Sequence, residues 1–485
     1  EYFMVVIHRD VYSPQKDVMA ARHDNSKNYN NTDGYGIAAD IGTTTVAISL
    51  FFFVFNRYCG NITENNSQTE LGADVMMRIM HANMGKGMLL HKMITEQLED
   101  MAGRISEGVC SAGAIKRMVV TGNTTMCHLF LGRDLRGMAG APFKPAYKGS
   151  VNITGKEIGF KKYPDINIHV MPGVTAHVGA DAVSALCSLE LYSTDKIQLA
   201  IDIGTNAEII LNNKGRIYVC SAAAGPAFEG QGIKCGIRAG RGAINGIKIT
   251  RTTGNIVLDV IDTDNVESGI SKEELIPKGI CGSGIVDAIA ELLKTGVLKP
   301  DGYLMGCEEA LQNGVKPSIA ERIKKDKKGN SFVIYNKEKN YTGYNGNKKE
   351  QDNRQFEIII TQNDIRNIQL AKAAIQAATE VLLEEAGISL DNIDEVKIAG
   401  VFGKFIHPDA AVLFGLYPDI DKDKMEFVGN AAGNGAAQAL VDDNFKKLAL
   451  EYSGKMEHIE LAGKNSFQEK FLNAMELKKW QAVYN

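Results

Sequence analysis

The sequence predicts an α/β protein made of two related lobes that face each other across a cleft. The first observation is a repeat: Asp-Ile-Gly-Thr occurs at residues 40–43 and again at 202–205, each time between β-rich segments. The second is the spacing, because the two copies begin 162 residues apart, about one domain length. The third is a pair of segments rich in Gly and Ala, 179–190 and 429–440, which are typical of helices that cross closely, although a plain buried helix fits residues 179–190 equally well. Together these features favour two similar halves joined by a hinge.

Each copy of the repeat predicts a phosphate-binding hairpin. A strand ends at Asp40, and Gly42 permits a tight turn whose backbone N–H groups can approach an anion. Thr43, Thr44 and Thr45 then add hydroxyl donors and favour a second strand. A carboxylate beside such a turn can hold hydrated Mg²⁺. Two such hairpins from two lobes would therefore clamp the phosphates of one nucleotide.

The rest of the chain divides by composition. Residues 22–33 are polar and rich in Asn and Asp, which is typical of a linker. The basic stretch 325–330 predicts the tip of a hairpin inside a polar insertion. We therefore expect four parts: an N-terminal remnant and linker (1–33), a first lobe (34–195), a second lobe (196–428) with a polar insertion (301–357), and a connecting helix with a C-terminal segment that returns to the first lobe (429–485).

Several glycine-bearing segments fit two interpretations each. The stretch 224–246, which includes Gly225, lines either a nucleotide cleft or a partner surface. Gly282 and Ser283 precede an amphipathic helix expected from about residue 285, where they either bind an anion or only cap the helix. Residues 122–125 likewise either cap a helix or contact a ligand.

A further glycine turn follows a strand near residue 398. It runs from Gly400 to Gly403, and its small residues would let a nucleoside ring lie flat on the backbone.

Other classes of site and protein are disfavoured. With 54 Lys and Arg against 58 Asp and Glu, the net charge of −4 gives no basic field for nucleic acid. The longest apolar run, residues 46–55, is too short for a membrane helix of about 20 residues. No P-loop motif is found, and the eight cysteines, with no C-x-x-C pair, are typical of reduced thiols in a cytoplasmic protein.

Taken in order, five segments resemble the motifs of the superfamily of actin, heat-shock chaperones, and sugar and acetate kinases. They correspond to its first phosphate, first connecting, second phosphate, adenosine and second connecting motifs, at residues 40–45, 179–186, 202–208, 398–403 and 429–440. The resemblance implies an actin-like ATPase fold with duplicated ribonuclease-H-like lobes and ATP bound in the cleft between them.

Within that superfamily the chain resembles the ATP-dependent reductive activators of corrinoid proteins. The resemblance rests on the motifs that begin at Asp40, Leu71, Gly122, Ala224, Ile280 and Gln369. It implies that ATP drives reduction of inactive Co(II) to Co(I) in the corrinoid (cobalamin) protein of a methyltransferase system. Members usually carry an N-terminal [2Fe–2S] domain, but no cysteine here precedes Cys59. We expect that domain to have been removed, or the electrons to come from a separate ferredoxin-like protein.

The resemblance also implies roles for single residues. Asp40 and Asp202 would hold Mg²⁺ through water, and Glu208 would polarise the water that attacks ATP. The nucleotide would be bound by Gly42, Thr43, Thr44, Thr45, Gly204, Thr205, Asn206, Gly225, Gly282, Ser283, Gly400 and Gly403. The expected partners are a Co(II) corrinoid protein and an electron donor, and the exposed lobe surfaces are compatible with a homodimer.

Three rival functions share parts of this pattern. A small-molecule kinase would use the same clamp, although no sugar- or acid-recognition motif is evident. A chaperone-like nucleotide switch would bind ATP without a redox consequence. An activator of radical-type dehydratases would need a cysteine motif to hold a cluster between subunits, and none is evident.

Overall fold

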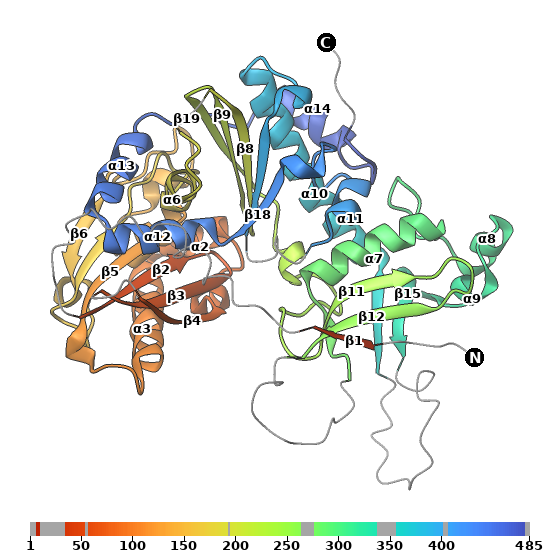
Figure 1. The fold of residues 1–485 in the computed structure, drawn as a ribbon, viewed down its shortest axis with the longest axis horizontal. Helices are drawn as coiled ribbons and strands as arrows, with labels where there is room; N and C mark the ends of the chain where they lie inside the picture. Colours follow the sequence, from red (N-terminus) through yellow and green to blue (C-terminus); the bar gives the residue numbers. More distant parts are fainter. Residues whose placement is uncertain are drawn as a thin grey trace, which may run out of the picture.

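Two six-stranded sheets form the centres of the two lobes, as Figure 1 shows for the computed structural model of the protein. The first lobe, drawn at the left of Figure 1, carries the N-terminal copy of the repeat, and the second lobe, drawn in the centre and at the right, carries the other copy. The structure describes residues 6–9, 34–53, 57–192, 195–262, 276–336, 356–400 and 406–480.

The first-lobe sheet has the order β4-β3-β2-β5-β7-β6, with β2, β3 and β4 antiparallel and β2, β5 and β7 parallel. Asp40 is the next-to-last residue of β2, opposite Ala47 of β3 and Thr121 of β5. The strands are β2 (Tyr35–Ile41), β3 (Thr45–Phe52), β4 (Arg57–Asn65), β5 (Ile115–Gly122), β6 (Val151–Thr154) and β7 (Asn167–Val170).

The second-lobe sheet has the order β18-β17-β8-β9-β10-β19, in which the five strands β10-β9-β8-β17-β18 repeat the arrangement β4-β3-β2-β5-β7 of the first lobe. Here β8, β9 and β10 are antiparallel and β17 is parallel to β8. Asp202 is the next-to-last residue of β8, opposite Glu208 of β9 and Ala399 of β17, which is the place that Asp40 has in the other sheet. The duplicated ribonuclease-H-like, actin-like fold is thereby confirmed. The strands are β8 (Ile197–Ile203), β9 (Ala207–Asn213), β10 (Arg216–Ala222), β17 (Glu395–Ala399), β18 (Met425–Gly429) and β19 (Glu457–His458).

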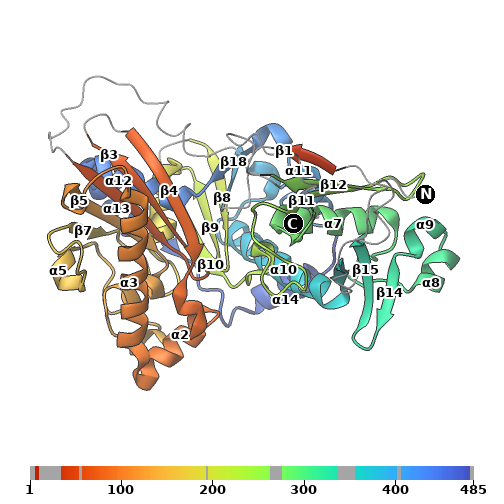
Figure 2. The same cartoon turned by 90° about the horizontal axis from the view of Figure 1, so that it is seen from below.

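Two smaller sheets extend the second lobe. One has the order β1-β12-β11-β13, and in it the short strand β1 from the expected N-terminal remnant pairs in parallel with β12. The other is β14-β15-β16, whose hairpin turns at the basic stretch predicted from the sequence. Figure 2 shows that hairpin with α8 and α9 at the end of the molecule away from the first lobe. The strands are β1 (Val6–Arg9), β11 (Ala243–Ile249), β12 (Ile256–Ile261), β13 (Gly279–Ile280), β14 (Ile323–Asp326), β15 (Gly329–Asn336) and β16 (Glu357–Thr361).

The helices begin and end where local chemistry directs them. Thr361 accepts a hydrogen bond from Asp364 N, and the Asp364 side chain accepts one from Thr361 N, a capping box that starts the longest helix, α10. None of the helices in the described ranges combines the length and apolar character that a membrane span requires. The helices are α2 (Val75–His81), α3 (Gly87–Ser106), α4 (Thr124–Phe130), α5 (Gly155–Ile158), α6 (Ala180–Ser188), α7 (Gly282–Thr295), α8 (Cys307–Gln312), α9 (Pro317–Ala320), α10 (Gln362–Glu385), α11 (Pro408–Leu413), α12 (Ala431–Val441), α13 (Asp443–Ser453) and α14 (Asn465–Asn473).

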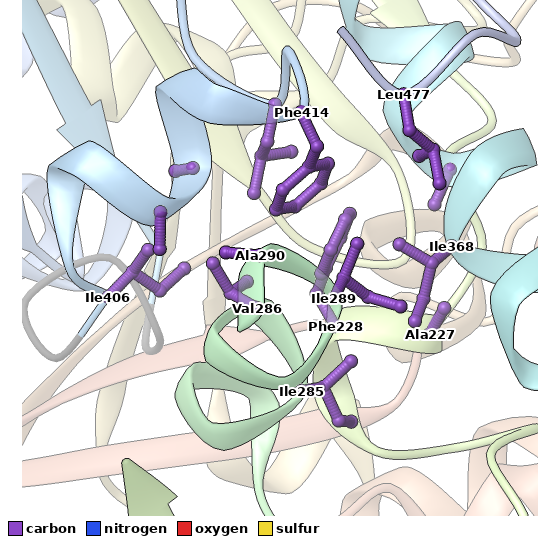
Figure 3. Packing of buried hydrophobic residues seen from close by; sticks show 14 of the residues in the cluster. Ala227, Phe228, Ile285, Val286, Ile289, Ala290, Ile368, Ile406, Phe414 and Leu477 are labelled. Carbon is purple, nitrogen blue, oxygen red and sulfur yellow. The ribbon is translucent and has the colours of Figure 1, made fainter. Parts of the chain in front are cut away.

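Each lobe has its own apolar core. In the second lobe, buried residues of α7 such as Ile285 and Ile289 pack with Phe228, Ile368 and Phe414 from three other segments (Figure 3). Burying an aliphatic or aromatic side chain of this size contributes about 1.5–3 kcal/mol. The core of the first lobe continues into α12 and α13 and onto one face of the second-lobe sheet. That shared face fixes how the two sheets lie beside each other.

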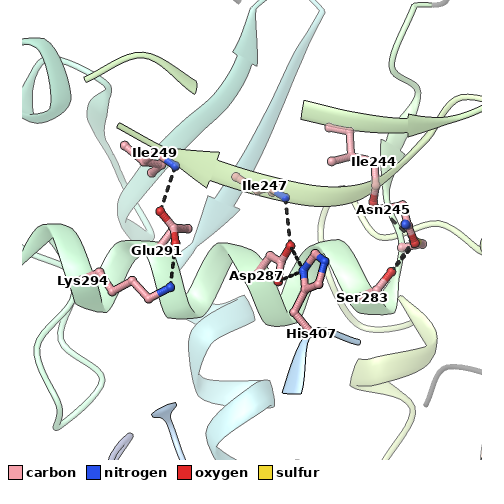
Figure 4. A network of polar contacts seen from close by, with 10 residues as sticks. Ile244, Asn245, Ile247, Ile249, Ser283, Asp287, Glu291, Lys294 and His407 are labelled. Carbon is pink, nitrogen blue, oxygen red and sulfur yellow. Dashed lines mark hydrogen bonds and ion pairs between the residues drawn. The ribbon is translucent and has the colours of Figure 1, made fainter. Parts of the chain in front are cut away.

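Two carboxylates of helix α7 accept hydrogen bonds from backbone N–H groups of β11. Asp287 accepts from Ile247 N at 3.1 Å and Glu291 accepts from Ile249 N at 2.8 Å (Figure 4). The two carboxylates are four residues apart in the helix, a rise of about 6 Å, and the two N–H groups are two residues apart in the strand, a rise of about 6.8 Å. The two spacings therefore match. Asp287 also bonds His407 Nδ1 at 2.8 Å, which ties the start of α11 to the same helix.

The two small-residue helices cross where the lobes meet. Ser188 of α6 donates to Ala431 O of α12 at 2.8 Å. A Cβ atom added at Gly435 of α12 would lie 2.4 Å from Ser184 O of α6, so only glycine allows this approach. The chain after residue 429 does not stay on the first lobe alone, because α12 and α13 pack there whereas β19 pairs with β10 and α14 packs on α10.

Candidate active site

The turns of the two hairpins face each other across one cleft. A cavity of about 110 Å³ lies between them and is smaller than the several hundred Å³ typical of a small-ligand pocket. Of the residues singled out from the sequence, its lining includes Asp40, Gly42, Thr43, Thr44, Thr45, Asp202, Gly204, Thr205, Asn206, Glu208 and Gly400. The fold therefore brings residues that are far apart in the sequence to one place.

Glycines shape this cleft by letting backbone segments approach. Gly42 N donates to Thr45 O at 2.8 Å, and a Cβ atom at Gly42 would lie only 2.7 Å from that oxygen. Gly400 has φ +106° and would place a Cβ atom 2.4 Å from Ile203 O, so a larger residue would push β17 and β8 apart at the cleft.

Threonine hydroxyls link the lobes directly. Thr44 Oγ1 and Thr205 Oγ1 are 2.5 Å apart, and the Thr205 hydroxyl also donates to Glu229 Oε1 at 2.8 Å. From the second lobe, Arg238 Nη2 donates to Thr45 Oγ1 at 2.5 Å. Burial raises the pKa of Glu229 and lowers the pKa of Arg238. The lobes therefore touch through hydroxyl groups that have the chemistry to bind phosphate oxygens.

The first turn rests on buried polar groups. Asn123 Nδ2 donates to Thr43 Oγ1 at 2.9 Å, and Asn66 Nδ2 donates to Gly42 O at 2.8 Å. The Arg78 guanidinium is fully buried beneath the turn and donates to Thr43 O, and burial lowers the pKa of Arg78 to about 10. These contacts hold the turn in one shape and place a positive charge behind it.

Five carboxyl groups line the cleft cavity: Glu229, described above, and Asp40, Asp181, Asp202 and Glu208. Removal from bulk water raises the pKa of Asp40 to about 6 and the pKa of Asp202 to about 8, the latter also because Asp40 and Asp181 lie nearby. Burial likewise raises the pKa of Asp181 and of Glu208. Asn430 Nδ2 donates to Asp40 Oδ2 at 2.8 Å, which partly offsets the shift at Asp40.

This donor set fits a hydrated divalent cation. Within the described parts of the chain, no lysine or arginine forms an ion pair with Asp40, Asp181 or Asp202. Clustered carboxylates without a cationic partner lower one another's tendency to ionise, and a magnesium ion that keeps its waters would relieve this. The residues present therefore suit Mg²⁺ held mainly through water.

The stability of the ligand-free protein is expected to fall as the pH rises from about 4 to about 8. When folding raises the pKa of an acid, its contribution to stability is complete below the pKa that it has in the unfolded chain. That contribution is lost as the pH rises through the pKa that it has in the folded protein. For Asp202 these two pKa values are 3.8 and about 8. Melting temperatures across this range should decline less in Asp202→Asn than in the wild type. Equal slopes would contradict the assignment.

Not every predicted residue lies in the cleft. Gly225 does not line the cleft cavity but contacts a residue that does, because its N–H donates to Thr205 O at 2.8 Å. Gly282 and Ser283 form the first turn of α7, which begins three residues earlier than expected, and the Ser283 hydroxyl donates to Asn245 Oδ1 at 2.6 Å (Figure 4). Gly282 and Ser283 do not line the cleft cavity. Gly403 lies outside the described residues.

A larger cavity, of about 1040 Å³, lies elsewhere in the second lobe. It is lined by α8, the β14–β15 hairpin and the start of α10, and it mixes Glu308 and Glu309 with Lys325, Lys328 and Arg366. None of the residues of the two hairpin turns lines it.

Comparison with known proteins identifies the family. A model described as the RACo middle region matches residues 35–194, and a model described as the C-terminal domain of RACo, the ASKHA domain, matches residues 196–484. The chain belongs to this family of reductive activators of corrinoid proteins. The two RACo matches together cover both lobes and the cleft between them.

Similar proteins agree with that membership. The chain is 34% identical to "Corrinoid activation enzyme RamQ" of Eubacterium limosum over 90% of this chain and 69% of the relative. It is 25% identical to "[Co(II) methylated amine-specific corrinoid protein] reductase" of Methanosarcina barkeri over 92% of this chain and 77% of the relative. A solved "Reductive activator for corrinoid,iron-sulfur protein" superimposes with a TM-score of 0.80 at 31% identity, covering 98% of this chain and 74% of that one.

Proposed function

We propose that the protein is an ATP-dependent activator of a corrinoid protein, which uses ATP binding and hydrolysis to drive reduction of inactive Co(II) to Co(I) in a methyltransferase system. The observation that carries the proposal is the meeting of two Asp-Ile-Gly-Thr hairpins, from opposite lobes, over a cluster of carboxylates in a member of the RACo family. The names of the two curated relatives, a corrinoid activation enzyme and a Co(II) corrinoid protein reductase, support the choice of partner.

In this proposal the cleft residues divide into four groups by role. Asp40 and Asp202 hold Mg²⁺ through water, and that ion, when bound, neutralises phosphate charge. The hydroxyl and N–H groups of Thr43–Thr45 and Gly204–Asn206 donate to phosphate oxygens. Glu208 orients the attacking water, and Gly400 faces the adenosine. Asp181, Asn123 and Asn430 join this set from their positions in the cleft.

ATP helps the electron transfer through a difference in affinity. The lobes close on the nucleotide. The closed activator binds the Co(II) form of the corrinoid protein more tightly than the open activator does. A ligand shifts a conformational equilibrium only by its differential affinity for the two states, so the free energy of ATP binding is delivered to the partner in this way. The electron itself comes from a ferredoxin-like domain or protein, and hydrolysis releases the partner.

The proposal predicts that ATP hydrolysis responds to the oxidation state of the partner. Steady-state phosphate release by the purified chain is measured alone, with a Co(II) corrinoid protein, and with the same protein in its methylated form. We expect marked stimulation by the Co(II) form only. ATP binding with no response to any corrinoid protein would overturn the proposal. Transfer of the γ-phosphate to a small acceptor would instead support the kinase alternative.

A further inference from the structure

A second cluster of metal-ligating side chains lies outside the nucleotide cleft. His177, His458 and Glu460 each place one nitrogen or carboxylate oxygen within 4.8 Å of the other two, and in the described ranges this is the one such group of three. His177 Nδ1 and Glu460 Oε2 are 2.9 Å apart. His177 precedes α6 of the first lobe, whereas His458 and Glu460 lie on and after β19, at the edge of the second-lobe sheet. In Figure 1, β19 lies between α13 and β9.

The backbone holds these side chains in place from both lobes. In the turn that carries His177, the Thr175 hydroxyl accepts from His177 N at 3.3 Å and from Val178 N at 3.2 Å. His458 is in register with Val219 of β10, and Ile459 N donates to Val219 O at 2.9 Å. The second carboxylate oxygen of Glu460 accepts from Ala462 N at 3.2 Å. Such outer contacts orient ligands at natural metal sites.

The chemistry of the cluster suits a borderline transition-metal ion. Two imidazoles and one carboxylate are a common protein ligand set for zinc, which leaves the fourth position open. A cavity of about 450 Å³ lies against all three side chains and gives access to the fourth position.

We propose that His177, His458 and Glu460 form a binding site for a first-row transition-metal ion, with Zn²⁺ the best match, that joins the two lobes. Tetrahedral zinc with bonds of about 2.1 Å holds its ligand atoms roughly 3.4 Å apart. The ligand atoms are close enough for side-chain rotations to reach that geometry. Because the ligands come from both lobes, the bound ion limits how far the lobes separate at this end of the sheet.

Two lysines also face this cavity. Lys144 and Lys148 line it. Both are exposed, so water screens their repulsion of a cation. Their charge favours an anionic fourth ligand, such as a hydroxide or a carboxylate, over a neutral one.

The test is metal binding by the full chain, measured by calorimetric titration with Zn²⁺ and by the visible spectrum after Co²⁺ substitution. We expect one Zn²⁺ per chain, a tetrahedral Co²⁺ spectrum, and a rise in melting temperature with Zn²⁺. His177→Asn and His458→Asn should each weaken binding by more than about tenfold, because loss of even an outer contact to a ligand costs about 10–100-fold in metal affinity. Glu457→Gln is the matched control, because it removes a carboxylate one residue away on the opposite face of β19 and should leave binding unchanged.

Two results would overturn the proposal. One is unchanged Zn²⁺ affinity in the His177→Asn/His458→Asn double variant. The other is the absence of binding by the wild type at 100-fold molar excess of Zn²⁺. Circular dichroism and ATP binding show whether each variant is folded, and Glu460→Gln provides a third ligand variant if a histidine variant is not. The test does not depend on the corrinoid partner, so its outcome is separate from that of the proposed function.

Discussion

Asp202→Asn is expected to lower the rate of ATP hydrolysis by about 100-fold or more, the usual effect of removing a group that stabilises transition-state charge. Asp202 lies at the end of β8 beside Asp40 and Asp181, and in our proposal it holds Mg²⁺ through water. An amide cannot supply the negative charge that balances the ion. Phosphate release at saturating Mg²⁺ and ATP measures the effect, and nucleotide binding should fall much less than turnover.

Asp165→Asn is the control for this experiment. Asp165 is an exposed aspartate in the turn before β7, and its replacement should leave turnover unchanged. Asp40→Asn should resemble Asp202→Asn, because the two residues occupy equivalent places in the two sheets. Normal turnover in both cleft variants would show that the reacting phosphate lies elsewhere.

Gly435→Ala is expected to disturb both stability and nucleotide binding. The added methyl group would lie 2.4 Å from the Ser184 carbonyl oxygen, so α12 and α6 would have to separate by about 1 Å. Overpacking of this kind costs about 1–3 kcal/mol or more, which exceeds the roughly 1 kcal/mol that alanine gains over glycine in a helix. Because Asn430 caps α12 and bonds Asp40, a shift of α12 also moves a cleft carboxylate.

Melting temperature and ATP affinity measure these two effects. Asn434→Ala, one residue away on the outer side of α12, is the matched control and should change neither markedly. A Gly435→Ala protein that is as stable as the wild type and binds ATP equally well would mean that the helix crossing tolerates a wider separation than its geometry indicates.

The sequence was sufficient for the duplicated fold, because the repeat carries its own flanking strands. Asp40 and Asp202 fall at equivalent register positions, as two copies of one hairpin require. The small-residue helices were also predictable, since few other arrangements use so many glycines and alanines in a helix. The contact between Gly435 and Ser184 shows the physical reason, because only a residue without a side chain lets the two helices come this close.

Other parts of the site depend on topology that a sequence pattern does not contain. Asp181 lies in one of the two helices predicted for their packing and Asn430 caps the other, and only the crossing of α6 and α12 brings them to Asp40. Ser283 has the residue type and helix position of an anion ligand, yet a buried partner, Asn245, accepts its hydrogen bond. Glu229 and Arg238 could be noted as charged residues in a glycine-rich loop, but their contacts with the two hairpins could not be predicted.

The direct bond between the Thr44 and Thr205 hydroxyls has a consequence for the timing of nucleotide entry. The two oxygens are 2.5 Å apart, so they fill the gap between the turns in which a phosphate group would lie. In our proposal a nucleotide enters only after that bond has broken, so we expect its association rate to follow how often the lobes open rather than diffusion. Once it is inside, the Thr44 hydroxyl exchanges a neutral partner, the Thr205 oxygen, for an anionic phosphate oxygen, and such charge-assisted bonds are about twice as strong. The contact between Thr44 and Thr205 is thus expected to delay the arrival of the nucleotide, and the new bond from Thr44 is expected to slow its departure.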